Sequence, residues 1–413
     1  MAVKINFSLT DEKYNFKSEE DFINWSFSNI KEVENNDFSF FSEINDIDIK
    51  KMENVILFLK YYLKVKKSCD KGMDKYNLSL RQLSDNEELK KALLEFVRMN
   101  DNGKFLRAMM VALGYHTIGK NDDKYLDLAL AVEVFQTSIL IHDDIIDNAD
   151  VRRGKDTIPV SYKKMYGKFK SHNFIEKRNK FADSMALCVG DLGFYLAEEL
   201  ITNGYKDCKN LSDILSYYHQ VAIKTCLGEM IDITLPFKEE FFETDKNLES
   251  KIMDVYRLKT AWYSVIGPFC LGLTLGDAAK EQITKMEQIL LNVGIAFQIK
   301  DDLLGIYGDD KVLGKSTNSD IQEFKQTLLY SYTMKTKYKE ELLEYYGKED
   351  LTSRKIDKVK DIFDKSGAKK YAEDIMNKLF SDSLDQLYKE KWISEKYQRI
   401  ISGFIIYLAN RIK

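Results

Sequence analysis

Apolar residues recur at helical spacing along most of the chain. The segments with this pattern are residues 55–65, 89–97, 105–118, 125–146, 181–201, 211–233, 252–275 and 283–304. No stretch of similar length alternates strictly between apolar and polar residues, as a half-buried strand does. Segment 128–141 is apolar almost all round, which indicates a helix covered by neighbours on every side. The pattern predicts an all-α fold in which a helical bundle surrounds the chemistry.

The composition favours one large domain. The chain has 413 residues, of which 44% are apolar and only 3 are proline. Scarce proline suits long helices, and no Pro-rich or Gly/Ser-rich stretch marks a linker. We therefore expect a single all-α domain over residues 51–413 with extended C-terminal helices, after an N-terminal extension of unknown role at residues 1–50. The segment 397–412 predicts an amphipathic helix packed on the body of the protein.

Charge and cysteine content exclude several classes of protein. A net charge of −4 gives no basic footprint for nucleic acid, and the five scattered cysteines include no CxxC pair for a disulfide framework or a zinc site. The acidic N-terminus lacks the apolar segment of a signal peptide. The uncharged run 260–276 is too short, and too interrupted by glycine and proline, for a membrane span. We expect a cytoplasmic protein.

An acidic cluster ends the most apolar helix and is the first candidate for chemistry. Asp143, Asp144 and Asp147 follow an apolar run that stops at residue 141. Their spacing lets the carboxylates share one face of a helix, where burial without a partner or a metal is costly. A few oxygen ligands without His or Cys suit Mg²⁺, which takes its other positions from water and substrate phosphates. The alternative interpretation is a helix cap or a surface acidic turn.

A second acidic pair strengthens the metal interpretation. Asp301 and Asp302 again end an apolar helix, and two such helix ends predict a Mg²⁺ site for a diphosphate. Cations that can bind phosphate lie near the same helices in the sequence, at Lys104, Arg107, Arg152, Arg153, Arg257, Lys259 and Lys315. Segment 308–316 ends in Gly-Lys-Ser, but its leading glycine is misplaced and it follows a helix, so it does not predict a nucleotide loop.

Taken together, these segments resemble the trans-isoprenyl (polyprenyl) diphosphate synthase family over residues 55–330. The matching motifs are Gly103-Lys104 with Arg107, Asp143-Asp144-Ile145-Ile146-Asp147, Arg152-Arg153-Gly154, Gly190-Asp191, Gly228 with Asp232, Lys259-Thr260-Ala261, Phe297-Gln298 with Asp301-Asp302, and Gly314-Lys315 with Ser319-Asp320-Ile321. The resemblance implies an isoprenoid synthase bundle, commonly a homodimer. Its members condense isopentenyl diphosphate with an allylic diphosphate by 1'-4 coupling.

The resemblance also implies a role for each matching residue. The implied Mg²⁺ ligands, for three ions per site, are Asp143, Asp147 and Asp301, with Asp144 and Asp302 as supporting carboxylates. The implied contacts to the allylic diphosphate are Arg152, Lys259 and Lys315. The implied isopentenyl diphosphate site is Lys104, Arg107, Arg153 and Gln136, and Thr260 and Gln298 are implied as further substrate-binding residues. Catalysis would then rest on positive charge at the departing diphosphate and on apolar walls that exclude water.

Four positions depart from the family's pattern. Gly305 stands where many members carry a third Asp, Ala108 where Pro is common, and Gln136 where many members have His. Glu229 replaces the usual Gln after Gly228. An added carboxylate near the expected diphosphates would weaken their binding.

Residues ahead of the first acidic motif predict the length of the product. On a helix that rises 1.5 Å per residue, Ile139 and Ser138 lie about 6 and 7.5 Å below Asp143, and Phe135 lies about 12 Å below it. In this family, bulky aromatics at the first two positions resemble a floor that stops growth at fifteen carbons. A small Ser138 above Phe135 therefore predicts twenty carbons, as geranylgeranyl diphosphate. The alternative products are farnesyl or longer polyprenyl diphosphates. The alternative interpretation of these residues is that they belong to the ordinary core and that another helix sets the floor.

Two other functions compete with this one. A class I terpene cyclase shares the fold and the first acidic motif, but it should carry an Asn/Ser/Glu motif in place of Asp301-Asp302. A catalytically weak partner subunit of a heteromeric prenyl synthase need keep only the fold, and Glu229 and Gly305 would fit partial decay. The activity of the purified chain alone separates these functions.

Overall fold

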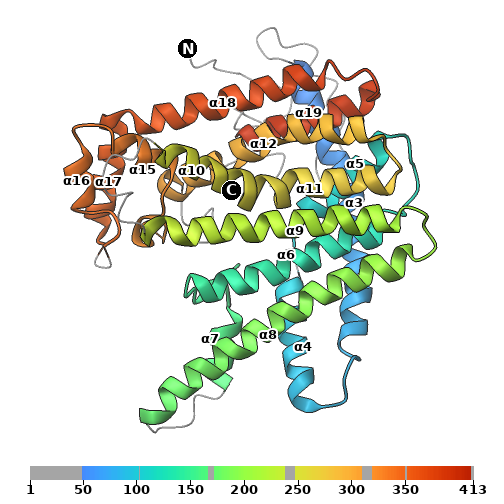
Figure 1. Ribbon diagram of the computed structural model, residues 1–413, viewed down its shortest axis with the longest axis horizontal. Coiled ribbons are helices and arrows are strands. Elements are labelled where there is room, and N and C mark those ends of the chain that lie inside the picture. Colours follow the sequence, from blue (N-terminus) through green and yellow to red (C-terminus); the bar gives the residue numbers. More distant parts are fainter. Residues whose placement is uncertain are drawn as a thin grey trace, which may run out of the picture. The chain divides into compact units, whose positions relative to one another are not determined.

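Helices account for nearly all the regular structure in the computed structural model, as the apolar pattern predicts (Figure 1). The structure describes residues 49–101, 103–165, 172–237, 247–308, 319–348 and 351–410, so most of the predicted extension at residues 1–50 lies outside the described residues. The elements are α3 (Ile49–Leu80), α4 (Glu87–Asn100), α5 (Leu106–Thr117), α6 (Leu126–Ile146), β1 (Val151–Arg152), β2 (Lys155–Asp156), α7 (Ile158–Met165), α8 (His172–Tyr205), α9 (Leu211–Thr234), η2 (Leu235–Phe237), α10 (Leu248–Val255), η4 (Tyr256–Ile266), α11 (Gly267–Leu275), α12 (Lys280–Tyr307), α14 (Ser319–Gln322), α15 (Leu328–Thr333), α16 (Lys339–Leu343), α17 (Ser353–Ser366), α18 (Ala368–Leu387) and α19 (Glu395–Asn410).

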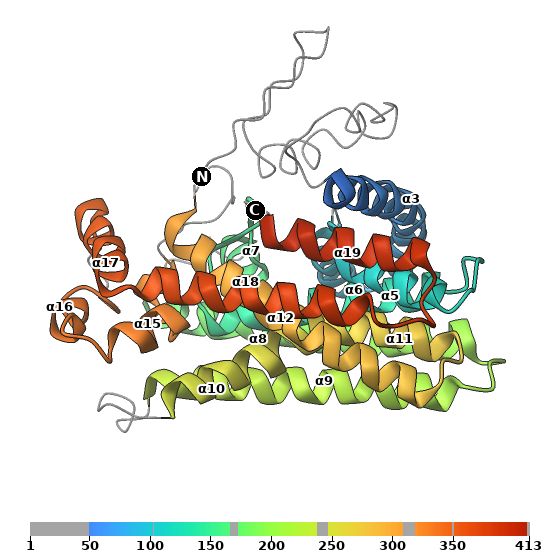
Figure 2. The same cartoon turned by 90° about the horizontal axis from the view of Figure 1, so that it is seen from above.

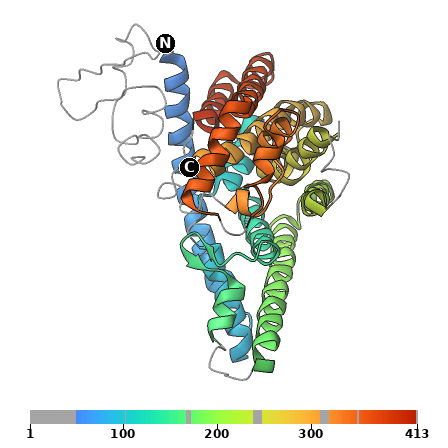
Figure 3. The same cartoon turned by 90° about the vertical axis from the view of Figure 1, so that its left-hand side faces the viewer.

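The contacts divide the chain into two compact units, which are described one at a time. The first-motif unit contains residues 65–219 and 268–278, and its middle is α6. Helix α8 packs along α6, and α4 and α7 both pack on α8 (Figure 3). Every residue of α6 from 128 to 135 is buried, which confirms the prediction of a helix covered on all sides.

Glycines let two helices of this unit touch through their backbones. A Cβ at Gly114 of α5 would lie 1.9 Å from the carbonyl oxygen of Phe269 in α11. A Cβ at Gly272 of α11 would lie 2.0 Å from the carbonyl oxygen of Val111. No side chain fits at either position, so the pair fixes α5 against α11.

The second-motif unit contains residues 1–64, 220–267 and 279–413, and its long helix α12 packs against η4, α18 and α19. Figure 2 shows α12 and α18 running side by side. The apolar face of α19 is buried, including Ile401, Phe404 and Ile405, and Gly403 packs against the backbone of Asn54 in α3. The predicted amphipathic C-terminal helix is therefore present and packed on the body.

The predicted helix at residues 252–275 is three successive elements. The middle one, η4, is a π-helix of 11 residues, in which the N–H of Gly267 bonds the carbonyl of Trp262, five residues back. Pro268 follows and has no N–H to bond residue 264, so the α-helical register cannot run through this point. Apolar spacing does not distinguish a π-helix from an α-helix, so the sequence did not predict η4. Because π-helices are rare and frequently occur at functional sites, η4 is a candidate part of the active site.

Among the described helices, none has both the length and the apolar character that crossing a membrane would require.

Candidate active site

The first acidic motif lies at the C-terminal end of α6. Asp143 and Asp144 are in its last turn, and Asp147 caps it through a bond from its N–H to the carbonyl of Asp143 at 2.9 Å. The side chain of Asp144 is 1% exposed and that of Asp143 is 20% exposed. A helix C-terminus carries partial negative charge, so carboxylates there need cations nearby.

Arg152 supplies part of that positive charge from a short hairpin. Its Nε donates to Asp144 Oδ1 at 2.5 Å and its Nη2 to Asp143 Oδ2 at 3.1 Å. The hairpin pairs Arg152 with Lys155, and its turn residues Arg153 and Gly154 have φ of 52° and 73°. Two-residue hairpin turns of this kind need φ above zero at both central positions. Burial lowers the pKa of Arg152, but the carboxylates more than offset it and the net pKa is raised.

The oxygens at this end of α6 fit Mg²⁺. Oδ2 of Asp144 is buried, and no donor of the described residues reaches it. Within the described part of the chain, no three acidic, His or Cys side chains converge closely enough to hold an ion alone. Mg²⁺ usually takes one or two carboxylates and fills the remaining positions with water and substrate phosphates. Asp143 and Asp147, which the sequence predicts as ligands, would supply those carboxylates.

The predicted isopentenyl diphosphate cations lie on a strained turn of the same unit. Lys104 is exposed, Arg107 is half-buried, and Phe105 between them has φ of 53° and ψ of 33°. A left-handed conformation at a bulky residue costs about 1–3 kcal/mol and persists only where the surroundings impose it. Phe105 is buried, and Lys66 Nζ lies 5.3 Å from the centroid of its ring. Gln136, the fourth predicted residue, is half-buried on α6.

Glu133 is a residue of this region that the sequence analysis missed. Its side chain is 6% exposed, and its Oε1 accepts the backbone N–H of Ala108 at 2.9 Å. The signal was present, because Glu133 is the one charged residue in segment 128–141. Burying a carboxylate is costly unless cations and hydrogen-bond donors surround it, so a lone acidic residue in an apolar helix predicts such partners.

Lys259 of the second-motif unit is held by two carboxylates of α9. Its Nζ lies 2.6 Å from Asp232 Oδ2 and 2.9 Å from Glu229 Oε2. The backbones approach closely here, because a Cβ at Gly228 would lie 2.3 Å from the backbone nitrogen of Lys259. The contact between α9 and η4 therefore places Lys259 beside both acids.

The second acidic pair has one buried and one accessible member. Asp301 is half-buried, whereas Asp302 is 2% exposed. Gln298 Nε2 donates to Asp302 Oδ1 at 2.8 Å, and the Tyr256 hydroxyl donates to Oδ2. Thr260 Oγ1 donates to Gln298 Oε1 at 2.5 Å, which joins η4 to the same network. Burial raises the pKa of Asp302 to about 6, against the lowering effect of a neighbouring lysine.

A profile of the polyprenyl synthetase family matches residues 86–364. The chain belongs to this family. It is 29% identical over 259 residues to the short chain isoprenyl diphosphate synthase of Methanocaldococcus jannaschii, which covers 62% of this chain and 70% of the relative. It is 28% identical over 297 residues to the geranylgeranyl diphosphate synthase of Saccharolobus solfataricus, covering 71% of this chain and 82% of the relative.

Solved structures confirm the fold of this family. The geranylgeranyl pyrophosphate synthase of Corynebacterium glutamicum, complexed with isoprenyl diphosphate and magnesium, superposes with a TM-score of 0.74 at 22% identity, covering 85% of this chain and 98% of that one. The geranylgeranyl pyrophosphate synthetase of Pyrococcus horikoshii gives a TM-score of 0.69 at 22% identity, with coverages of 86% and 98%. The predicted isoprenoid synthase bundle is therefore confirmed.

One departure from the polyprenyl synthetase pattern lies beside a second carboxylate. A Cβ at Gly305 would lie 2.3 Å from Oδ2 of Asp320, so the carboxylate of Asp320 occupies the space beside position 305. Lys325 Nζ lies 3.7 Å from that oxygen and 3.5 Å from Asp302 Oδ1. A side chain at position 305 would therefore require the carboxylate of Asp320 to move.

The predicted chain-length residues line the contacts of α6 with its neighbours. Phe135 packs against the rings of Phe194 and Tyr218, with centroids 5.5 and 5.4 Å away. Ser138 is fully buried where a Cβ at Gly193 would lie 2.0 Å from its Oγ and 2.4 Å from Cε2 of Phe96. Ile139 is half-buried. Ser138 and Phe96 of α4 thus both lie beside Gly193.

One predicted site residue, Lys315, which is expected to contact the allylic diphosphate, lies outside the described residues.

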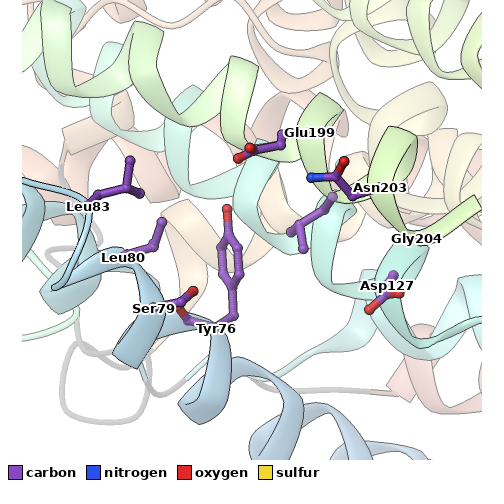
Figure 4. A pocket seen from close by; sticks show the side chains of 9 residues that line it. Tyr76, Ser79, Leu80, Leu83, Asp127, Glu199, Asn203 and Gly204 are labelled. Atoms are coloured by element: carbon purple, nitrogen blue, oxygen red, sulfur yellow. The ribbon is translucent and has the colours of Figure 1, made fainter. Parts of the chain in front are cut away.

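A pocket of about 500 Å³ opens in the first-motif unit between α3, α6 and α8 (Figure 4). None of the predicted site residues lines it; the lining residues are Tyr76, Ser79, Leu80, Leu83, Asp127, Glu199, Leu200, Asn203 and Gly204.

Proposed function

We propose that the chain condenses isopentenyl diphosphate with an allylic diphosphate and releases mainly geranylgeranyl diphosphate. As a member of the polyprenyl synthetase family the chain is a trans-prenyltransferase that makes short-chain products. The observation that supports the site most directly is the pairing of Arg152 with Asp143 and Asp144, because it brings acidic and cationic family motifs together at one helix end.

Each group then has a defined task. Asp143, Asp147 and Asp301 would hold Mg²⁺, at three ions per site, with Asp144 and Asp302 supporting them. The bound metal would supply positive charge at the leaving diphosphate. Arg152 and Lys259 would contact the same diphosphate, and preorganised cations at a developing negative charge lower the barrier to its departure. Lys315 is assigned to this diphosphate as well.

The remaining residues serve the second substrate and the carbocation. Lys104, Arg107, Arg153 and Gln136 would bind isopentenyl diphosphate, with Thr260 and Gln298 as further contacts. The apolar wall of α6 would keep water away from the allylic cation until the double bond of isopentenyl diphosphate attacks it. The departed diphosphate then takes the proton that is lost.

The deciding experiment is an assay of the purified chain alone with isopentenyl diphosphate, an allylic starter and Mg²⁺. A twenty-carbon diphosphate as the main product would support the proposal, and a fifteen-carbon or longer one would correct only the chain length. No product from the chain alone, with activity restored by a second subunit, would identify a catalytically weak partner. A hydrocarbon product would identify a terpene cyclase.

Substituting the isopentenyl diphosphate cations should separate the two substrates. Lys104→Ala or Arg107→Ala is expected to raise the apparent KM for isopentenyl diphosphate about tenfold, and that for the allylic substrate by less, since a charge-assisted contact is worth about 1.5–3 kcal/mol. Steady-state kinetics with each substrate varied in turn gives both constants. Lys206→Ala, an exposed lysine of the same unit, is the control. The opposite ranking would mean that the two diphosphate sites are exchanged.

Glu229→Gln should tighten binding of the allylic diphosphate. Lys259 faces two carboxylates 2.6 and 2.9 Å away, so a phosphate must compete with both for its ammonium. Removing one charge is expected to lower the KM for the allylic substrate about three- to tenfold, since charged hydrogen bonds carry about 1.5–3 kcal/mol and solvent screens part of it. Glu344→Gln, on an exposed residue, is the control. An unchanged or higher KM would show that Glu229 does not compete with the diphosphate for Lys259.

We propose that the enzyme is a homodimer. Ile223, Leu227 and Met230 of α9 are exposed at i, i+4 and i+7, which forms an apolar stripe on one face of the helix. Such stripes on a soluble protein mark contact surfaces. Sedimentation equilibrium should give twice the 48.1 kDa of one chain, and Met230→Glu should shift the equilibrium toward the monomer. A wild-type mass of one chain at micromolar concentration would contradict the proposal.

A further inference from the structure

Helix α5, which follows the strained turn at Lys104, begins without a cap of its own. Its N-cap residue is Phe105, which has no polar side chain and makes no side-chain capping bond. The first four N–H groups of any helix lack partners within the helix and need acceptors from elsewhere. The start of α5 therefore depends on a neighbouring element.

Glu133 of α6 provides the missing acceptor. Its Oε1 accepts the N–H of Ala108, which is the third residue of α5 and the position that an N-cap side chain normally serves. The backbone N–H of Arg107 also donates a hydrogen bond to the same carboxylate. A Cβ at Gly103 would lie 3.8 Å from Oε2, so the carboxylate sits inside the curl of the chain from residue 103 to 108. A negative charge at this end of a helix is also favoured by the helix dipole.

The charges of two predicted isopentenyl diphosphate cations act on the same carboxylate. Burial raises the pKa of Glu133, and Arg107 and Arg153 oppose that effect by their charge. Both arginines lie on turns with left-handed residues, Phe105 before Arg107 and Arg153 itself. Strained turns persist when the surrounding structure holds them, and Glu133 accepts the N–H of Ala108 just after the turn at Phe105.

The turn of α6 that carries Glu133 is joined to other helices by a buried polar chain. Thr137 Oγ1 lies 2.9 Å from Asn100 Oδ1 and 3.1 Å from the carbonyl oxygen of Glu133, and its one hydroxyl proton donates to either acceptor. Asn100 Nδ2 in turn donates to Asn77 Oδ1 at 3.1 Å, which links α6 to α4 and α3. The carboxylate thus extends from a rigid part of the fold toward the turn.

We infer that Glu133 is a positioning residue for isopentenyl diphosphate, because it caps α5 and holds the backbone that presents Lys104 and Arg107. This inference rests on the proposed function, in which those two cations bind that substrate. Glu133 does not touch the reacting atoms. Its removal should therefore weaken the binding of isopentenyl diphosphate and leave the departure of diphosphate from the allylic substrate almost unchanged.

The test compares three variants in the full chain. Glu133→Ala removes both the acceptor and the charge and should raise the KM for isopentenyl diphosphate at least tenfold, with the KM for the allylic substrate and kcat within about twofold of wild type. Glu133→Gln keeps an acceptor oxygen for the N–H of Ala108 and should recover part of the loss. Asp127→Asn, on an exposed carboxylate in the first turn of α6, should leave both KM values unchanged.

The outcomes separate this inference from the proposed function. If the wild-type chain makes no prenyl diphosphate, the proposed function fails, and no inference about its substrates stands. If the wild type is active but Glu133→Ala lowers kcat alone, or raises both KM values equally, Glu133 has only a structural role and the inference is overturned. Should Glu133→Ala not fold, the Gln variant decides by the same ratio of KM values, and isothermal calorimetry with isopentenyl diphosphate alone checks it without turnover.

Discussion

Asp143→Ala is expected to lower kcat by about 10²- to 10³-fold, as the loss of one group that stabilises transition-state charge does in other enzymes. The side chain of Asp143 is 20% exposed, so its removal takes away a proposed oxygen ligand and not a core contact. It also leaves Arg152 with Asp144 as its remaining partner of the two. Asp301→Ala should have an effect of the same order, because it removes a proposed metal position at the other motif.

The measurement is the rate of prenyl transfer as a function of Mg²⁺ concentration. The variants should need more Mg²⁺ for their remaining activity, while thermal unfolding stays within a few degrees of wild type. Asp385→Ala, on an exposed position of α18, is the matched control and should change neither quantity. Near-normal turnover by Asp143→Ala would refute the assignment of the first motif as a metal site.

The sequence predicts the helices well because burial of one helix face makes apolar residues recur at helical spacing along the chain. Each predicted apolar segment coincides with one helix except residues 252–275, which form three successive elements, and α6 is buried on all sides over residues 128–135. The exceptions have local causes. The strands β1 and β2 have two residues each, too few to show alternation, and the π-helix η4 keeps an apolar spacing close to that of an α-helix.

The acidic motifs were recognisable because their spacing is local, whereas their partners come from distant parts of the chain. The pairing of Arg152 with Asp144 spans eight residues and was within reach of a motif search. The position of the Asp320 carboxylate beside Gly305 depends on the tertiary fold, which the spacing of residues in the sequence does not show. Glu133 lies between these cases, since its burial was predictable and its contact with α5 was not.

The length of the product should change when the aromatic floor below the first motif is altered. Phe135 lies about 12 Å below Asp143 along α6, and its ring packs between those of Phe194 and Tyr218. Phe135→Ala removes that ring and should lengthen the main product beyond twenty carbons, because the growing tail can enter the vacated space. The same change should cost about 3–5 kcal/mol of stability.

A control must separate this loss of stability from the change of product. Phe363→Ala removes an equally buried ring from α17 and should cost a similar amount, with the product distribution unchanged. Chromatography of the dephosphorylated products gives their chain lengths, and thermal unfolding gives the stability. A longer product from both variants would attribute the effect to a loosened fold.

The opposite substitution tests the same wall from above. Ser138 lies against Gly193 and Phe96, so Ser138→Phe must push the ring of Phe96 aside or project into the path of the tail. The product should shorten to fifteen carbons, with a loss of about 1–3 kcal/mol from overpacking. Ser138→Ala, which fits the same space, should leave the product at twenty carbons. If neither Ser138→Phe nor Phe135→Ala moves the distribution, α6 does not measure the chain, and Phe96 of α4 becomes the next residue to substitute.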